Sequence, residues 1–394
     1  MISQILVFNS GSSSFKFSLY QSDQSEPILA GLAEQLGSQQ ACISFEYKQN
    51  KQKFKTPNSN HEAAINFVLD QFKTLNIDTS LIKAIGHRVV HGGEFYNDSV
   101  IVNDEVLNNL ESCSDLAPLH NPANIQGIKI MQNLFKDIPQ IAVFDTAFHQ
   151  TLPKHAYLYA VDYNWYKDYA VRRYGFHGTS HKYVAQQAKT ILKLDDKHQL
   201  ITIHLGNGCS ACAIKDGKSV DTTMGMTPLE GLVMGTRCGD IDPSILQFIA
   251  NKTNLSLDEI TTKLNKQSGL LGLSGLSNDM RTLIAASATN PQAKIAIDVF
   301  CFKLAKQIMA LATSLSKIDV LVFTGGIGEN SAFIREEVLE HLVLLGYKVE
   351  TEFNNHQKLY NGQITKANTP LAMVIKTDEE LMIKNDTTRL IFSN

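Results

Sequence analysis

The chain has 394 residues, of which 43% are hydrophobic and 19% are charged, a composition typical of a folded protein rather than a disordered one. This length exceeds what one ordinary hydrophobic core accommodates, so we expect two domains. The formal net charge is -3, with both signs interspersed. That balance argues against nucleic acids and anionic membranes as partners, because both require a basic surface.

No stretch of the sequence has the character of a membrane span. The most apolar long segment, Ala293 to Leu315, is interrupted by charged residues and predicts a buried helix instead. The N-terminus lacks the basic start and long apolar run of a secretory signal, so we expect a cytoplasmic location. Cys209 and Cys212 form a C-x-x-C without a second pair at zinc spacing, in a segment that resembles a strand. We therefore expect small buried cysteines in a reducing compartment.

A turn rich in small residues lies near the N-terminus, from Asn9 to Lys16, between the strand-like runs 5–8 and 15–20. One glycine and four serines offer many small donors, which suits an anion held by backbone N–H groups. Lys16 adds a positive charge, and the side-chain oxygen of Asn9 can face a metal directly or through water. Taken alone, the segment is more often a plain hairpin turn.

The rest of the first half alternates strands and helices. A strand over 84–90 leads into His91-Gly92-Gly93. Asn121 followed by Pro122 predicts a helix start, with Asn121 as the N-cap, and His120 precedes this natural anion site. A strand over 141–144 ends at Asp145, which serves either as a helix cap or as a functional carboxylate.

The second half repeats this theme. A strand over 200–205 turns at Gly206-Asn207-Gly208 and returns over 209–214, a unit that resembles the opening hairpin. A weak internal duplication follows, with two related lobes that each offer one phosphate-facing turn. A strand over 320–323 precedes Gly325 to Asn330, and apolar residues from Ile334 to Leu345 then predict an amphipathic helix. Strands that alternate with helices predict an α/β fold with mixed sheets.

The segment from Gly325 to Asn330 joins a strand to a helix, which is where open α/β sheets bind ligands. Its glycines allow a flat ring or a phosphate to approach the backbone. Neither the dinucleotide fingerprint nor the Walker A spacing fits the chain. The alternative is a tight strand-to-helix turn without a ligand.

Two arginines and two histidines occupy loops next to predicted strand and helix ends. Arg88 and Arg237 carry the planar fork that suits carboxylate and phosphate oxygens. The alternative is an ordinary salt bridge, for Arg237 with Asp240 or Asp242. His120 and His177 both precede helical runs, a position that raises the prior for a catalytic histidine above that of an isolated one.

Seven of these segments, taken in order, resemble the acetokinase family over nearly the whole chain. The matching stretches are 9–16, 87–93, 145–149, 174–181, 204–208, 235–243 and 325–330. Their number and order make the resemblance specific. It implies an α/β fold of two ribonuclease-H-like lobes, as in actin-like ATPases, with mixed sheets flanked by helices and an active-site cleft between the lobes. The N-terminal lobe is expected over 1–149 with 378–394 and the nucleotide-binding, dimer-forming lobe over 150–377.

The activity implied by this resemblance is reversible, in-line transfer of the γ-phosphoryl group of ATP to acetate, giving acetyl phosphate and ADP. It implies Mg²⁺, or Mn²⁺ in its place, and a homodimer. A propionate or butyrate kinase of the same family is the nearest alternative, because one methylene changes binding by only ~1–3 kcal/mol. A non-metabolic, actin-like ATPase is a more distant one.

The resemblance also implies roles for individual residues. The expected metal ligands are Asn9 and Glu379, and the expected catalytic residues are Asp145, His177 and Arg237. The acceptor is expected to contact Arg88, Val90, Leu119, His120, Phe176 and Pro228. The nucleotide is expected to contact Lys16, His204, Leu205, Gly206, Asn207, Gly208, Asp279, Met280, Arg281, Gly325, Gly326, Ile327, Gly328 and Glu329. Asp145 is the family's acid/base or metal-positioning carboxylate, and we favour the metal role because an ionised carboxylate acceptor needs no strong base.

One departure from the family pattern is Cys238, where a serine is expected beside Arg237. A neighbouring guanidinium can lower the pKa of a thiol and make it reactive. We favour the alternative, a small residue in a tight loop.

Overall fold

The computed structural model describes residues 3–118 and 120–392, and these form an α/β fold in two compact units. The first unit extends to Gln150 and also includes the segment from Asp378 onward. The second unit runs from Thr151 to Thr377. None of the helices in the described ranges has the length and apolar character that crossing a membrane requires.

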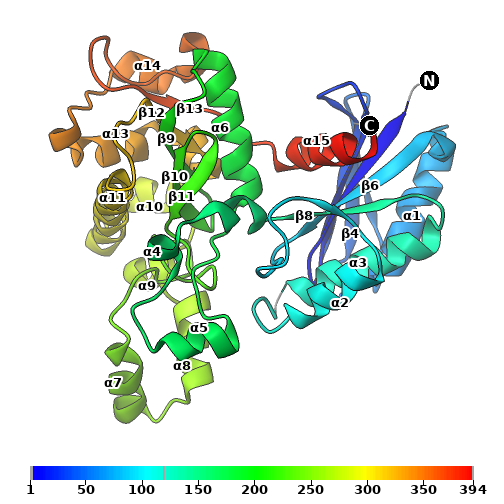
Figure 1. The fold of residues 1–394 in the computed structure, drawn as a ribbon, viewed down its shortest axis with the longest axis horizontal. Helices are drawn as coiled ribbons and strands as arrows, with labels where there is room; N and C mark the ends of the chain where they lie inside the picture. The colour runs from blue at the N-terminus through cyan, green and yellow to red at the C-terminus, as the bar shows by residue number, and fades with distance from the viewer. Residues whose placement is uncertain (1–2, 119, 393–394) are drawn as a thin grey trace. The chain divides into compact units, whose positions relative to one another are not determined.

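A mixed sheet forms the centre of the first unit, with strand order β5-β4-β3-β2-β1-β6-β8-β7. The strands are β1 Gln4–Ser10, β2 Phe15–Gln21, β3 Pro27–Glu34, β4 Cys42–Tyr47, β5 Asn50–Lys55, β6 Ile82–Val89, β7 Val100–Ile101 and β8 Gln140–Phe144. The helices are α1 His61–Thr74, α2 Asp104–Ser112, α3 Asn121–Leu134 and α15 Glu379–Phe392. Figure 1 shows α1 and α3 on one side of this sheet and α15 on the other.

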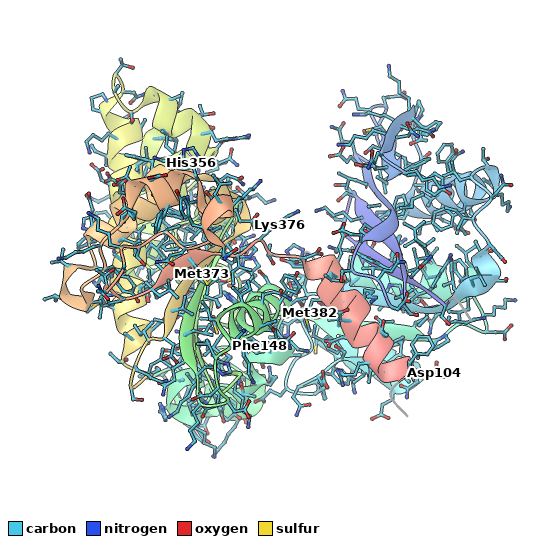
Figure 2. All side chains as sticks on the ribbon, turned by 90° about the horizontal axis from the view of Figure 1, so that it is seen from above. Asp104, Phe148, His356, Met373, Lys376 and Met382 are labelled. Carbon is cyan, nitrogen blue, oxygen red and sulfur yellow. The ribbon has the colours of Figure 1, made fainter. Side chains whose placement is uncertain are left out.

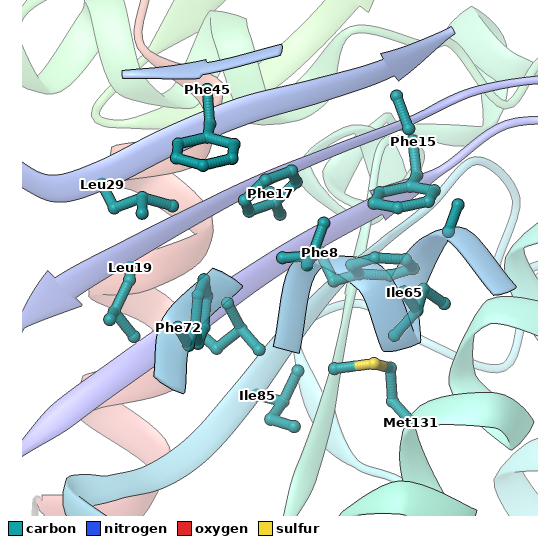
Figure 3. Close-up of a cluster of buried hydrophobic side chains, with 14 of the residues drawn as sticks. Phe8, Phe15, Phe17, Leu19, Leu29, Phe45, Ile65, Phe72, Ile85 and Met131 are labelled. Carbon is teal, nitrogen blue, oxygen red and sulfur yellow. The ribbon is translucent and has the colours of Figure 1, made fainter. Parts of the chain in front are cut away.

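One face of this sheet forms the main core of the unit. Phe8, Phe17 and Leu19 project from it toward Phe72 of α1 and Met131 of α3 (Figure 3). These side chains are almost wholly buried, so this face contributes most of the unit's hydrophobic stabilisation. The β1–β2 hairpin predicted from the sequence is confirmed, with Asn9 paired opposite Lys16.

The opposite face of the sheet receives α15. Gly86 faces this helix, because a Cβ added there would lie 2.3 Å from Oγ1 of Thr387 and 2.8 Å from Cγ2 of Ile383. Met382 of α15, labelled in Figure 2, is also buried. The missing side chain of Gly86 therefore lets the last helix lie directly on β6.

The second unit is built around a smaller mixed sheet, with strand order β11-β10-β9-β12-β13. Its strands are β9 Gln199–Leu205, β10 Cys209–Lys215, β11 Lys218–Thr222, β12 Val320–Thr324 and β13 Ala372–Val374. Its helices are α4 Lys154–Tyr157, α5 Tyr163–Tyr169, α6 Gly178–Leu192, α7 Ser244–Thr253, α8 Leu257–Lys266, α9 Gly269–Ser274, α10 Met280–Ala286, α11 Pro291–Ala312, α12 Gly325–Asn330, α13 Ala332–Glu340 and α14 Thr351–Asn355. Figure 1 shows α6 and α11 on opposite sides of this sheet.

The two sheets share one topology. In each, an antiparallel three-stranded meander is followed by two parallel strands: β3-β2-β1-β6-β8 in the first unit and β11-β10-β9-β12-β13 in the second. The prediction of two related lobes is thus confirmed at the level of strand order and direction. Each lobe has a turn between its first two strands, where the sequence predicts a phosphate-facing turn.

Several local predictions are also settled. The apolar segment 293–315 falls mainly in the helix α11, and Cys209 and Cys212 are buried in β10, as expected. The amphipathic helix after β12 is shorter than predicted. Helix α13 ends at Glu340, and residues 343–345 form a 3₁₀ turn instead, closed by Gly346 in the left-handed conformation.

Replacing Gly86 with alanine should weaken the docking of α15. The added Cβ would overlap Thr387 and Ile383, and overpacking of this kind costs about 1–3 kcal/mol. We expect a lower thermal midpoint by circular dichroism. Gly326→Ala is the matched control, because a Cβ there meets nothing within 4 Å, and its midpoint should not fall. An unchanged midpoint for Gly86→Ala would mean that α15 does not pack tightly on β6.

Candidate active site

Polar residues gather on one face of the first sheet, at the carboxyl ends of its parallel strands. Adjacent strand residues point to opposite faces, so Arg88 shares the α15 face of β6 with Gly86. Ser18 of β2 lies on this face as well, since its hydroxyl bonds to Glu380 of α15. Lys16 is two residues from Ser18, and Asn9 is directly opposite Lys16. The strand register therefore places Asn9, Lys16 and Arg88 on one face.

An ion pair holds Arg88 at the centre of this group. Its Nε donates to Oδ1 of Asp145 at 3.0 Å, and its Nη2 donates to Oδ2 at 2.6 Å. Oε2 of Glu379, the first residue of α15, lies 3.8 Å from Nε of Arg88. Burial by itself lowers the pKa of Arg88, but the two carboxylates outweigh it and hold the pKa above its usual value. Thus Arg88 does form a salt bridge, the alternative considered from the sequence.

The ion pair uses only one edge of the guanidinium. Nη1 of Arg88 has no hydrogen-bond partner within residues 3–118 and 120–392. Asp145 thus holds the arginine in a fixed orientation while its other edge stays available for an anionic ligand. The side chain of Asp145 itself is almost completely buried.

Two asparagines of α3 hold the neighbouring loop. Asn121 accepts from the backbone N–H of His91 and donates to its carbonyl, at 3.1 and 2.9 Å. Asn124 accepts from Val90 and donates to the carbonyl of Ser10, at 3.0 and 2.6 Å. The prediction that Asn121 caps α3 is wrong, because its side chain binds this loop and His120 takes the N-cap position, where its side chain makes no capping hydrogen bond.

The β1–β2 turn presents backbone donors. Gly11 uses its N–H to close the turn on the carbonyl of Ser14, at 2.7 Å. The N–H groups of Ser12, Ser13 and Ser14 have no acceptor in the described part of the chain. Successive amides of this kind suit an anion, so these three N–H groups remain available for the predicted phosphate cradle.

In the second unit, Gly208 is the point where two predicted catalytic side chains meet. A Cβ on Gly208 would lie 3.4 Å from Nη1 of Arg237 and 3.4 Å from Nε2 of His177. The ring of His177 also stacks on that of His204, with centroids 4.4 Å apart. Because glycine leaves this space open, both side chains border the same small volume.

Arg237 does not form the salt bridge considered as its alternative. Its Nη1 donates to the carbonyl of Pro228 at 3.0 Å, and in the described residues it has no carboxylate partner. Asp240 instead accepts from Gly231 and Gln307. Burial lowers the pKa of Arg237 below its usual value. A buried cation without a counter-ion is costly, which suits a site that binds an anion.

A pocket of about 740 Å³ lies within the second unit, next to Gly208. It brings together seven residues predicted for the nucleotide: Gly206, Asn207, Asp279, Met280, Arg281, Gly326 and Ile327. Sequence reasoning missed other lining residues, namely Asn278, Ile284, Ala285 and Ser331, and it did not assign Asn330 to the site. Asn278 donates to Asn207 at 3.0 Å, a contact between distant segments that no sequence signal indicates.

The remaining residues predicted for the nucleotide site do not line this pocket. Leu205, Gly325 and Gly328 are buried in the fold. Gly325 has φ +76°, and a Cβ there would lie 2.7 Å from the carbonyl oxygen of Leu205, so only glycine fits. Gly325 to Asn330 forms the short helix α12 rather than an open turn. Glu329 closes this helix, accepting from the N–H groups of Gly325 and Thr377 at 3.0 Å each.

A buried arginine holds the other end of α12. Arg335 donates to the carbonyls of Gly328 and Glu329, at 2.9 and 3.1 Å, and to Asn354. It is only 1% exposed and has no carboxylate partner among the described residues, so burial lowers its pKa to about 10. Sequence reasoning missed this residue, although it fixes the helix whose Gly326 and Ile327 line the pocket.

The other predicted residues differ in burial and environment. Leu119 lies outside the described residues, so that prediction stands as made. His120 is exposed at the start of α3, and Phe176 is buried next to His177. Burial raises the pKa of the Cys238 thiol above its usual value, the opposite of the shift that a reactive thiol requires, so we keep the small-residue interpretation.

The donor set of the first unit suits a hard divalent cation. Asn9, Asp145 and Glu379 supply oxygen donors on one sheet face, and magnesium is usually held by one or two carboxylates together with substrate phosphates. No cluster of three or more His, Cys, Asp or Glu side chains in residues 3–118 and 120–392, on this face or elsewhere, is arranged to bind a metal by itself.

Comparison with known proteins decides the family. The model of the acetokinase family matches residues 4–385. The chain belongs to the acetokinase family. An acetate kinase from Stutzerimonas stutzeri is 50% identical over 390 residues, covering 98% of each chain. Among solved structures, a propionate kinase from Francisella tularensis gives a TM-score of 0.94 at 44% identity, covering 98% of this chain and 100% of that one. An acetate kinase from Porphyromonas gingivalis gives a TM-score of 0.92 at 40% identity, covering 98% of this chain and 99% of that one.

Replacing Arg335 with lysine should loosen α12. An ammonium group cannot reproduce the forked bonds to two carbonyls and Asn354, so buried acceptors lose their partners. We expect the α12 amides to exchange with deuterium about tenfold faster, measured by mass spectrometry. Arg281→Lys, the same change at an exposed position, should leave this exchange unchanged. Equal exchange in the Arg335 variant and the parent would contradict this role.

Proposed function

We propose that this protein transfers the γ-phosphoryl group of ATP to acetate, releasing acetyl phosphate and ADP, and that it also catalyses the reverse reaction. The observation that carries this proposal is the 50% identity to a protein named acetate kinase, over 98% of both chains. The geometry of each unit supports it. The first unit presents groups that suit a carboxylate. The second unit contains a pocket next to two side chains that carry positive charge or donate hydrogen bonds.

In this proposal the pocket of the second unit binds the nucleotide. Its size fits a mononucleotide, since ligand pockets commonly span ~300–1,000 Å³. Gly206 and Asn207 line it and lead directly to Gly208, the glycine that borders Arg237 and His177. A nucleotide whose base lies over α12 would thus extend its phosphates toward these two side chains.

The first unit, in the same proposal, binds the acceptor. The open edge of Arg88 holds the acetate carboxylate, and the buried Val90, two residues further along the chain, contacts the methyl group. Asp145 keeps Arg88 in position. Asn9, Asp145 and Glu379 hold Mg²⁺ or Mn²⁺, which when bound neutralises charge on the phosphates.

Transfer itself needs alignment and charge more than covalent help from the protein. The transferring group spreads negative charge over three equatorial oxygens, and fixed donors aimed at those oxygens lower the barrier. Arg237 and His177 supply such donors from one side. The amides of Ser12 to Ser14 and the ammonium of Lys16 supply further positive potential in the first unit.

The proposal extends to assembly and location. We infer a homodimer that forms through the second unit, because α5 and α7 carry large exposed apolar side chains. These are Tyr163, Trp165, Tyr169 and Phe248. Surfaces of this kind mark interaction sites in soluble proteins. We also place the enzyme in the cytoplasm, where ATP and reduced cysteines are both available.

The direct test is the formation of acyl phosphate, trapped with hydroxylamine, from ATP, magnesium and a carboxylate. We expect the highest kcat/KM with acetate, a value within about 10–200-fold for propionate and a lower one for butyrate, because each methylene changes binding only modestly. A propionate kinase in the family, 44% identical to this chain, makes propionate the second candidate. Higher kcat/KM for propionate would establish that candidate, whereas ATP hydrolysis without acyl phosphate would overturn both.

Asp145→Asn should lower kcat at least 100-fold. The change removes a carboxylate that orients Arg88 and, in our proposal, the metal. If Asp145 organises the metal, the magnesium concentration for half-maximal rate rises and excess magnesium restores part of the activity. If it accepts a proton, excess magnesium has no effect.

The matched control is Asp98→Asn, which breaks an exposed ion pair with Arg389 in the same unit. Exposed pairs contribute little, so its rate should equal that of the parent. An unchanged rate for Asp145→Asn itself would mean that neither role is correct.

A further inference from the structure

A line of buried hydrogen bonds leads from the middle of β9 to the catalytic histidine proposed above. Oγ1 of Thr202 lies 2.7 Å from Nδ1 of His181 on α6. The other ring nitrogen of His181, Nε2, lies 2.7 Å from Oγ of Ser210 on β10. Ser210 in turn lies 2.9 Å from Nδ1 of His177. Thr202, His181 and Ser210 are all fully buried, whereas His177 is partly exposed.

The direction of these bonds follows from Thr202. Its hydroxyl has no other hydrogen-bond partner in the described part of the chain, and it is inaccessible to solvent. A buried hydroxyl proton that donates to nothing is unfavourable, so the O–H of Thr202 donates to Nδ1 of His181. This nitrogen is therefore the acceptor of the ring, and the proton of a neutral His181 is on Nε2.

The same reasoning gives the direction of the hydrogen bonds at Ser210 and His177. Nε2–H of His181 donates to Oγ of Ser210, and the single hydroxyl proton of Ser210 then donates to Nδ1 of His177. His177 therefore carries its own proton on Nε2. A cationic His177 would donate from Nδ1 to Ser210, and the hydroxyl proton of either Ser210 or Thr202 would then lack an acceptor, so the arrangement also favours the neutral ring.

We propose that Thr202 is a positioning residue that sets the tautomer of His177 through His181 and Ser210. The tautomer decides what His177 offers at Gly208. Nε2 is the atom that borders the open volume beside Nη1 of Arg237. With its proton there, His177 donates a hydrogen bond into that volume, whereas the other tautomer presents a lone pair.

The consequence for catalysis rests on the proposed phosphoryl transfer. An equatorial phosphoryl oxygen gains negative charge in the transition state, so an N–H donor stabilises it and a lone pair repels it. Thr202 thus acts on the reaction without touching a substrate. The position also tolerates a clean test, because valine has nearly the same shape as threonine and the same preference for strands.

The test is nitrogen NMR of the full-length protein labelled with ¹⁵N-histidine, at a pH where the rings are neutral. The two tautomers differ in which ring nitrogen shows the shift of a protonated atom. In the parent we expect His177 and His181 both as the Nε2–H form. In Thr202→Val, both rings should show a mixture of tautomers, because the hydroxyl that donates to Nδ1 of His181 in the parent is removed. Thr202→Ser should restore the parent spectrum.

Kinetics provide the second measurement. Loss of one transition-state donor typically costs 10²–10³ in kcat, and a mixture of tautomers loses it in only part of the molecules. We therefore expect kcat to fall in proportion to the Nε2–H fraction that is lost, about two- to tenfold in Thr202→Val, with KM for ATP and acetate within about twofold of the parent. Thr222→Val is the matched control: its buried hydroxyl donates to a backbone carbonyl of Ala211 and contacts no histidine in the described residues.

The outcomes separate this inference from the proposed function. An Nδ1–H form of His177 in the parent, or an unchanged tautomer and unchanged kcat in Thr202→Val, overturns the inference. If Thr202→Val fails to fold, Ser210→Ala breaks the same line at another point and must shift the His177 tautomer. If the parent forms no acyl phosphate, the proposed function fails, yet the spectra still test whether Thr202 sets the tautomer.

Discussion

Parallel strand pairing beside an antiparallel hairpin is the constraint on which both half-sites depend. In the first unit β1, β6 and β8 run in the same direction, so Asn9, Arg88 and Asp145 reach one end of the sheet from three distant segments. In the second unit β9 and β12 are parallel, and the turn at Gly206 and the helix α12 leave the sheet at the same end. Side chains at the carboxyl ends of several strands could not meet if those strands were antiparallel neighbours, whose carboxyl ends lie at opposite edges.

The arginines show how burial assigns different tasks to one residue type. Arg88 has a carboxylate partner on one edge, which orients it and leaves the other edge open. Arg335 is surrounded by carbonyls and an amide, and so serves as a rigid support for α12. Arg237 has a single carbonyl and a desolvated charge, the arrangement best suited to an incoming anion. All three side chains carry the same charge, so their different roles depend on their hydrogen-bond partners.

Much of this arrangement could be predicted from local patterns. The β1–β2 hairpin, the strand ending before Asp145 and the buried helix over 291–312 all follow from apolar periodicity, which depends only on neighbouring residues. The helix boundaries were less accurate. Asn121 has the residue type of an N-cap, but its amide binds His91 instead, and no local rule can foresee a competing partner from a distant strand.

The sequence by itself determined the family, the alternation of strands and helices, and seven residues that line the pocket of the second unit, because these are encoded in short motifs whose order is readable. Only the tertiary structure decided which bonds those residues make. It paired Arg88 with Asp145, left Arg237 without the carboxylate partner considered as the alternative, and brought Asn278 to Asn207. It also aligned Thr202, His181, Ser210 and His177. The reason is physical: a buried polar group takes whichever partner the fold brings within 3 Å or so, and that partner is usually far away in the chain.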